Sequence, residues 1–230
     1  MEYDFTLNLA RIHEAIAAAS ARVGRDPASV TLLAASKNVP PERLREAYAA
    51  GIRCFGENRV QDRDAKQASL AGLPIEWHLL GPLQSNKAAR ALELFDVIET
   101  VDSLALAQRL SRLARQPVLV MLEVNLACEP QKHGVAPAHA VALTRAAVAL
   151  PNLRLCGVMA VPPAAENPEA SRPHFRALVA LSAQIRAALP SPPARWDISM
   201  GMSHDFPVAI EEGATVVRLG AALFGPRPQP

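Results

Sequence analysis

The 230-residue chain has few of the residues that cross-link small proteins or hold metal ions. Its three cysteines, Cys54, Cys128 and Cys156, are widely spaced and contain no C-x-x-C pair, and its six histidines contain no closely spaced ligand pair. This pattern argues against a disulfide framework and against a thiolate zinc site. A chain of this length buries roughly 70–75% of its unfolded surface, so it needs no such cross-links.

Long apolar runs are also missing. No window of 18 residues is free of polar side chains, so no membrane span is expected. The first residues include Glu2 and Asp4 and lack the apolar stretch of a secretory signal. We therefore expect a soluble cytoplasmic protein without a membrane partner.

Lysine and aromatic residues are scarce. Aromatic residues make up only 4% of the chain, so alanine, leucine and valine must fill its core. The 24 cationic residues include just four lysines, which are Lys37, Lys66, Lys87 and Lys132. The arginines are scattered among 22 acidic residues, whereas nucleic-acid binding requires a clustered basic patch. We therefore expect no nucleic-acid partner, and a search for an imine-forming lysine has four candidates.

Eight apolar segments alternate with segments of helical periodicity, after a helix predicted from Asp4 to Val23. The apolar segments begin near residues 30, 52, 75, 97, 117, 154, 195 and 215. This alternation predicts a parallel sheet covered by helices. Eight such units fit a single-domain (β/α)8 TIM barrel. The competing doubly wound open sheet normally has a glycine-rich turn after its first strand, and residues 36–41 (SKNVPP) contain no glycine.

We expect one barrel domain over residues 1–230, with an N-terminal helix in residues 1–23 and a Pro-rich tail at 226–230. In such barrels the chemistry collects where the strands end. The residues expected at that rim are Lys37, Glu57, Asn58, His78, Gly81, Glu123, Asn125, Met159, Ser199 to Ser203, Arg218 and Gly220. A partly desolvated lysine beside other cations can act as an imine-forming nucleophile, which makes Lys37 the first candidate. The alternative is an ordinary solvated lysine.

Two turns rich in small residues follow the seventh and eighth predicted strands, SMGMS and LGAA. Backbone N–H groups there, with the hydroxyls of Ser199 and Ser203, predict a phosphate site. The alternative is that Gly201 and Gly220 only permit tight turns. An imine-forming lysine together with a phosphate site suits pyridoxal 5′-phosphate, but it also suits an aldolase acting on a sugar phosphate. Arg218, placed against the pyridine nitrogen, would keep that nitrogen unprotonated; alternatively it forms a salt bridge at the rim.

Six segments, in the order LLAASK, FGENRVQD, EWHLLGPLQSNK, GVMAVPP, DISMGMSHD and VVRLGAALFG, resemble the pyridoxal phosphate homeostasis protein family. The resemblance runs from about Val30 to Gly225. It implies a barrel of the alanine racemase N-terminal-domain type that binds pyridoxal 5′-phosphate. It implies that Lys37 is the internal-aldimine lysine and that Arg218 faces the pyridine nitrogen. It places Ser199 and Gly220, with neighbouring main chain including Gly201 and Ala221, at the phosphate, and Asn58 and Met159 on the ring or substrate side.

The chain departs from the family at Ala221, where members often have threonine. We expect a modest loss of phosphate affinity there, because one hydroxyl donor is missing while the backbone N–H remains. The resemblance implies a non-catalytic protein that serves intracellular homeostasis of the cofactor, with the cofactor and apo-enzymes that use it as partners. We expect a monomer, since no large exposed apolar stripe is evident.

The alternative is a racemase or related enzyme of low activity that depends on the same cofactor. Racemisation on this kind of barrel uses two bases, and in the related racemases the second is a tyrosine from another domain. This chain has only Tyr3 and Tyr48, both in predicted helices. Arg218 would also oppose carbanion formation, so efficient racemisation is not expected.

Overall fold

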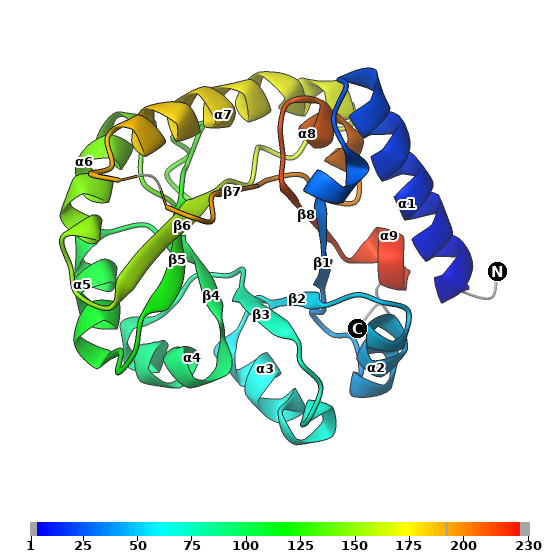
Figure 1. Cartoon of the computed structure of the whole chain (residues 1–230), viewed down its shortest axis with the longest axis horizontal. Coiled ribbons are helices and arrows are strands. Elements are labelled where there is room, and N and C mark those ends of the chain that lie inside the picture. The colour runs from blue at the N-terminus through cyan, green and yellow to red at the C-terminus, as the bar shows by residue number, and fades with distance from the viewer. Residues whose placement is uncertain (1–3, 192, 226–230) are drawn as a thin grey trace.

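Eight parallel strands close into a barrel in the computed structural model, which describes residues 4–191 and 193–225 (Figure 1). Each strand pairs with the next along the chain, and β8 pairs with β1. The strands are β1 (Thr31–Ala35), β2 (Cys54–Glu57), β3 (Glu76–Leu79), β4 (Val97–Val101), β5 (Val118–Glu123), β6 (Leu153–Met159), β7 (Asp197–Ser199) and β8 (Val216–Leu219). The predicted TIM barrel is confirmed, and the open sheet is excluded.

Helices surround the barrel and connect successive strands (Figure 1). They are α1 (Phe5–Arg22), α2 (Pro41–Ala49), α3 (Val60–Lys66), α4 (Ala88–Leu94), α5 (Leu104–Leu113), α6 (Pro137–Val148), α7 (Arg172–Ala187), α8 (Phe206–Glu211) and α9 (Ala221–Phe224). Short 3-10 turns precede or join them: η1 (Pro27–Ser29), η2 (Ala68–Leu70), η3 (Ser85–Lys87) and η4 (Pro168–Ser171). None of the helices in the described part of the chain has the length and apolarity needed to cross a bilayer.

The predicted N-terminal helix forms α1, which packs against α8 and α9 on the outside of the barrel (Figure 1). Its first turn is capped by Asp4, whose side chain accepts a hydrogen bond from the Leu7 N–H at 3.0 Å. Leu9, Ile12 and Ile16 lie on one buried face. Tyr3 and the predicted Pro-rich tail at 226–230 lie outside the described residues.

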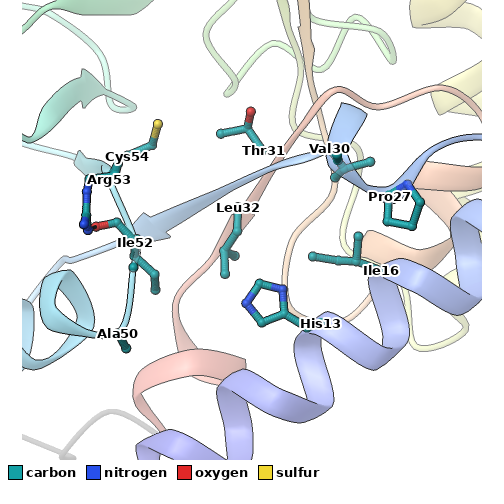
Figure 2. Close-up of a pocket in the computed structure, with 12 residues that line it drawn as sticks. His13, Ile16, Pro27, Val30, Thr31, Leu32, Ala50, Ile52, Arg53 and Cys54 are labelled. Carbon is teal, nitrogen blue, oxygen red and sulfur yellow. Dashed lines mark hydrogen bonds between the residues drawn. The ribbon is translucent and has the colours of Figure 1, made fainter.

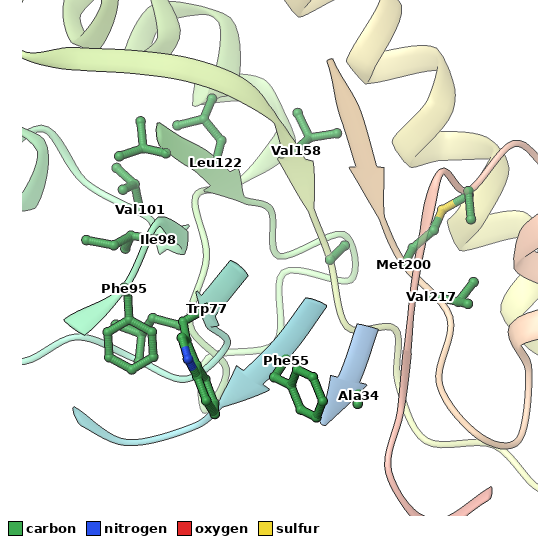
Figure 3. Packing of buried hydrophobic residues seen from close by; sticks show 14 of the residues in the cluster. Ala34, Phe55, Trp77, Phe95, Ile98, Val101, Leu122, Val158, Met200 and Val217 are labelled. Atoms are coloured by element: carbon green, nitrogen blue, oxygen red, sulfur yellow. The ribbon is translucent and has the colours of Figure 1, made fainter. Parts of the chain in front are cut away.

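The strands alternate between an apolar outer face and a mixed inner face. Phe55, Trp77, Ile98, Leu122 and Val158 belong to the main buried cluster that lies between strands and helices (Figure 3). Their neighbours along the strands point into the barrel, as the two-residue period of a strand requires. A small separate cluster made by Val97, Met121 and Cys156 fills part of this lumen. Several further buried side chains on the strands are charged, namely Glu57, Glu99 and Arg218, together with His78. This is unusual because barrel interiors are normally filled by bulky apolar residues.

Candidate functional site

A cavity of about 530 Å³ lies at the rim formed by the C-terminal ends of the strands, and Lys37 and Asn58 both line it. Lys37 follows β1 and is half-buried, whereas Asn58 follows β2 and is exposed. The other polar lining residues are Arg59, Gln61, Gln84, Lys87, Asp102 and His133. In the described structure no side-chain hydrogen bond or ion pair holds the Lys37 ammonium group. Lys37 and Asn58, two of the predicted site residues, therefore line one cavity, and the Lys37 amine is free to react with a ligand there.

The backbone just before Lys37 is held from the neighbouring strand and helix. The Ser36 hydroxyl lies 2.7 Å from Glu57 Oε1, and the Ser36 carbonyl accepts a hydrogen bond from Lys66 Nζ at 2.8 Å. Lys66 Nζ also forms an ion pair with Glu57 at 2.5 Å, and the Glu57 side chain is fully buried. In the sequence, Lys66 was only one of four candidate imine-forming lysines. The structure shows instead that Lys66 fixes the end of β1, from which Lys37 projects.

Arg218 lies in β8 inside the barrel and is only 6% exposed. Its guanidinium donates to Ser199 Oγ at 2.7 Å and to the Ala160 carbonyl at 3.0 Å. Because β8 pairs with β1, placing Arg218 opposite Leu33, the strand that carries Arg218 lies beside the strand that leads to Lys37. Burial lowers the pKa of Arg218, and the nearby charges of Glu99, Glu123 and Asp205 oppose that shift. A rim salt bridge, the alternative considered for this arginine, is not found among residues 4–191 and 193–225.

The hydroxyl of Ser199 forms hydrogen bonds inside the barrel. Ser199 is fully buried, its O–H donates to Glu99 Oε2 at 2.6 Å, and its oxygen accepts from Arg218. A phosphate group needs donors, and this hydroxyl has no second proton to offer. In this structure the Ser199 hydroxyl proton is committed to Glu99, and a role for Ser199 at the phosphate stays a prediction.

Ser203 is the hydroxyl that lies at the start of α9. Its Oγ accepts a hydrogen bond from the Ala222 N–H at 3.1 Å, which leaves the Ser203 proton without an acceptor in the described structure. Asp205 shapes the turn that carries Ser203, because one carboxylate oxygen accepts from the Met202 N–H at 2.8 Å. The other carboxylate oxygen accepts from the Ser171 hydroxyl at 2.8 Å.

The remaining predicted residues surround the same end of β6, β7 and β8. Met159 ends β6, is buried, and pairs in register with Ser199. Gly201 has φ +90°, and its carbonyl accepts from the Arg218 N–H at 3.0 Å. Gly220 caps α9, and Ala221 is the exposed first residue of that helix. The structure thus joins Met159, Ser199, Gly201 and Arg218 through contacts, whereas Gly220 and Ala221 are linked to them through the chain and the turn containing Ser203.

His78 does not lie at the rim, contrary to the sequence-based expectation. Its side chain is 1% exposed inside the barrel, with Nδ1 2.5 Å from Glu99 Oε1 and Nε2 2.8 Å from Glu76 Oε1. Sequence reasoning missed Glu99 altogether. A signal was available, since Glu76, His78 and Glu99 interrupt apolar strands at positions that alternation directs inward.

Glu123 ends β5 and carries a buried carboxylate oxygen, Oε2, without a hydrogen-bond partner. Burial raises the pKa of Glu123 to about 7, the charges of Asp102 and Glu99 add to the rise, and Arg218 opposes it. The charge of Glu123 on β5, which changes near neutral pH, therefore interacts with the charge of Arg218 on β8.

A second cavity, of about 540 Å³, lies among the start of β1, the start of β2 and helix α1 (Figure 2). In Figure 2 the His13 ring of α1 points toward Leu32, and Cys54 lies at the far edge. None of the predicted site residues lines this cavity. Since it adjoins the beginnings of the strands, it is at the other end of the barrel from Lys37.

The sequence and fold of this chain are similar to those of known proteins. The family model described as the alanine racemase N-terminal domain matches residues 7–228. A curated protein from Pseudomonas aeruginosa, named pyridoxal phosphate homeostasis protein, is 45% identical over 96% of this chain and 94% of its own length. The chain belongs to the pyridoxal phosphate homeostasis protein family. Members of that family from Aquifex aeolicus and Escherichia coli are 42% and 39% identical over 95% and 97% of the chain.

Solved structures agree with this family membership. PipY of Synechococcus elongatus, solved with PLP bound, is 43% identical, has a TM-score of 0.81, and matches over 93% of this chain and 100% of its own. The alanine racemase of Clostridium difficile has a TM-score of 0.72 at 15% identity, covering 98% of this chain and 56% of its own, and shows the shared fold. The family and the fold expected from the six sequence segments are confirmed.

Proposed function

We propose that this protein binds pyridoxal 5′-phosphate at the rim of the barrel and serves its homeostasis without efficient catalysis. When bound, that cofactor supplies an aldehyde, which condenses with a lysine amine with loss of water and is released again by hydrolysis. Lys37 carries the proposal, because its amine lines the rim cavity at the end of β1, the strand that pairs with the strand of Arg218, and no ionic partner holds it among the described residues. The names of the relatives and the PLP-bound PipY structure support the same ligand.

Three groups of this chain fit the three ends of that cofactor. Lys37 offers the amine, and Arg218 offers a cation fixed by Ser199 and Ala160. The Ser203 hydroxyl, with the Ala221 N–H at the start of α9 and the main chain at Gly201 and Gly220, offers donors for a phosphate. Asn58 and Met159 are assigned to the ring side. The residue roles predicted from the sequence are kept, and the Ser203 hydroxyl is added as a donor.

A non-catalytic role is supported by the position of the candidate second base. Among the described residues the only tyrosine is Tyr48 in α2, and Arg53 at the start of β2 stacks over its ring at 4.1 Å. This places the phenol toward the other end of the barrel from Lys37. Racemisation requires a base on each face of the substrate, and the described structure offers no tyrosine at the second face.

The proposal also covers the proteins that receive the cofactor, the oligomeric state and the cellular compartment. Apo-enzymes that use the cofactor are the proposed receivers, since an imine can be hydrolysed or exchanged without further machinery. The protein is proposed to act as a monomer. The three cysteines are free, which suits a reducing compartment such as the cytoplasm.

The visible spectrum tests the proposal. Purified wild-type protein incubated with pyridoxal 5′-phosphate should turn yellow and retain the colour through desalting. Lys37→Ala should remain colourless, while Lys87→Ala, which removes another lysine of the same cavity, should still turn yellow. A colourless wild type would overturn cofactor binding. Rapid exchange of the α-proton of L-amino acids in deuterated water by the coloured protein would overturn the non-catalytic role.

A further inference from the structure

A continuous chain of hydrogen bonds runs through the barrel lumen from Arg218 toward the starts of the strands. Its links measure 2.7 Å from Arg218 to Ser199, 2.6 Å from Ser199 to Glu99, and 2.5 Å from Glu99 to His78. It continues over 2.8 Å from His78 to Glu76, and Glu76 receives both terminal nitrogens of Arg195 at 3.0 Å. We call this the lumen chain; its members are Arg218, Ser199, Glu99, His78, Glu76 and Arg195.

With Glu76 and Glu99 both ionised, the lumen chain forms only when His78 is protonated on both ring nitrogens. Each nitrogen faces a carboxylate oxygen, and an ionised carboxylate can only accept. A neutral ring has one N–H, so it would leave a nitrogen lone pair against an oxygen lone pair at one of these contacts. Burial works against the charged ring, but hydrogen bonding with Cys54, and with Glu76 and Glu99 as acceptors, outweighs it and raises the pKa of His78 well above its usual value.

Glu99 is correspondingly held as a carboxylate. Burial works against its charge, but the hydrogen bond and the positive charge of His78, with Arg218 beyond, lower its pKa. Because Glu99 only accepts, the Ser199 proton must point at Glu99, and the Ser199 oxygen then faces the Arg218 guanidinium. The proton order of the lumen chain is therefore fixed from His78 to Arg218.

The charges along the lumen chain alternate. With His78 protonated, Arg218, His78 and Arg195 are positive, whereas Glu99 and Glu76 are negative, and Asp197 adds a carboxylate 2.6 Å from Arg195. Buried charges are tolerated only when they are paired and hydrogen-bonded. Removing one partner leaves the other charge buried without a partner, which strongly destabilises the fold. Glu123 and Asp205 also act on Arg218, but neither forms a hydrogen bond with it or with Ser199 in the described structure.

We propose that Glu99 and His78 are positioning residues that hold the Arg218 guanidinium in its orientation toward the pyridine nitrogen of the cofactor. This proposal rests on the proposed function. Arg218 uses two hydrogen bonds on Ser199 and Ala160, out of the five N–H donors of a guanidinium. The lumen chain thus fixes the orientation of the Arg218 guanidinium and leaves its other N–H groups free to bind the ligand. Glu99 and His78 would then influence the electronic state of the cofactor through Arg218, although neither residue touches the cofactor.

A metal site is the competing explanation for part of the lumen chain. Cys54, Glu76 and His78 offer ligand atoms that lie within 4.8 Å of one another. However, the Arg195 guanidinium already occupies both oxygens of Glu76. A divalent cation there would have to displace one cation and deprotonate His78. We therefore assign these residues to the lumen chain.

The first experiment uses the protein without cofactor. Nitrogen-15 NMR of labelled histidine should show protons on both ring nitrogens of His78 at pH 8. In Glu99→Gln the His78 ring should lose a proton at lower pH than in the wild type. A singly protonated His78 ring in the wild type at pH 7, or a marked change on adding zinc, would overturn the proposal.

The second experiment compares two matched glutamates at pH 6, where most Glu123 side chains are protonated. At this pH, Glu99→Gln should weaken binding of pyridoxal 5′-phosphate about tenfold. In a separate pH titration, Glu99→Gln should shift the pH at which the absorption band of the bound form changes. Glu123→Gln should bind within a factor of two of wild type and keep the wild-type band. Equal effects of both substitutions, or no effect of Glu99→Gln, would contradict the proposal.

Ser199→Ala keeps the proposal testable if Glu99→Gln does not fold. It cuts the lumen chain between Glu99 and Arg218 but leaves the His78–Glu99 contact. We expect the same loss of affinity and band shift as in Glu99→Gln, with His78 still doubly protonated. A wild-type band in Ser199→Ala would overturn the proposal. If wild-type protein takes up no cofactor, the proposed function fails, while the NMR result still decides the state of His78.

Discussion

Glu123 shows how a single buried carboxyl links stability to pH. Burial raises its pKa to about 7 in the folded protein, compared with an ordinary value near 4.5. The folded state therefore binds this proton more tightly than the unfolded state. Its contribution to stability is fully present below about pH 4.5 and is lost as pH rises through about 7.

Glu123→Gln should consequently stabilise the protein more at pH 8 than at pH 5. The difference in the free energy of unfolding should be on the order of 3 kcal/mol. Urea unfolding at both values of pH measures it. An equal effect at pH 5 and pH 8 would show that Glu123 ionises normally in the folded protein.

Ala221 is the residue where this chain departs from the family pattern. It is exposed at the first position of α9, so a larger side chain can be placed there. Ala221→Thr would add a hydroxyl donor at the proposed phosphate site. We expect pyridoxal 5′-phosphate to bind roughly tenfold more tightly, since one hydrogen bond to a charged group contributes about 1.5 kcal/mol.

Fluorescence titration of both proteins with cofactor measures this change, and inorganic phosphate serves as a competitor. The melting temperature without cofactor should stay the same, because Ala221 lies on the surface. Unchanged affinity would place the phosphate away from α9.

At the scale of elements, α3 is fastened to the ends of β1 and β2 by Lys66. The ammonium group binds both the fully buried Glu57 carboxylate and the Ser36 carbonyl. Lys66→Met should lower the free energy of unfolding by about 3–5 kcal/mol, because it leaves a buried carboxylate unpaired.

The double variant Glu57→Gln, Lys66→Met removes both charges and should recover much of that loss. Urea unfolding of the two single variants and the double variant tests this coupling. Additive losses would mean that the ion pair does not hold α3 to the strands.

For the whole molecule, the distribution of apolar surface predicts a monomer. The large apolar residues that are exposed in the described structure are spread along the chain: Leu7 in α1 and Val23 at its C-cap, Leu104 in α5, and Val161 and Met202 after β6 and β7. Light scattering after gel filtration should therefore give a mass near 24.6 kDa, with and without cofactor. A stable dimer mass would contradict this expectation.

The barrel could be predicted because its strands are apolar on both sides in the sequence, as VTLLAA and PVLVML illustrate. The partners of the inward-facing charges could not. Glu99 stands in the middle of DVIETV, and only the closed barrel shows that it meets His78 and Ser199. Similarly, Ser199 and Ser203 lie in one short turn. Which hydroxyl points into the lumen and which toward α9 depends on where β7 ends.

The central claim is that Lys37 holds the cofactor, and covalent trapping tests it most directly. Borohydride adds hydride to a C=N bond, which with a proton becomes a stable C–N bond on whichever lysine carries the cofactor. Peptide mass mapping of the reduced protein should find the added group on Lys37. Finding it on Lys66, Lys87 or Lys132 instead, or on no lysine, would contradict the account.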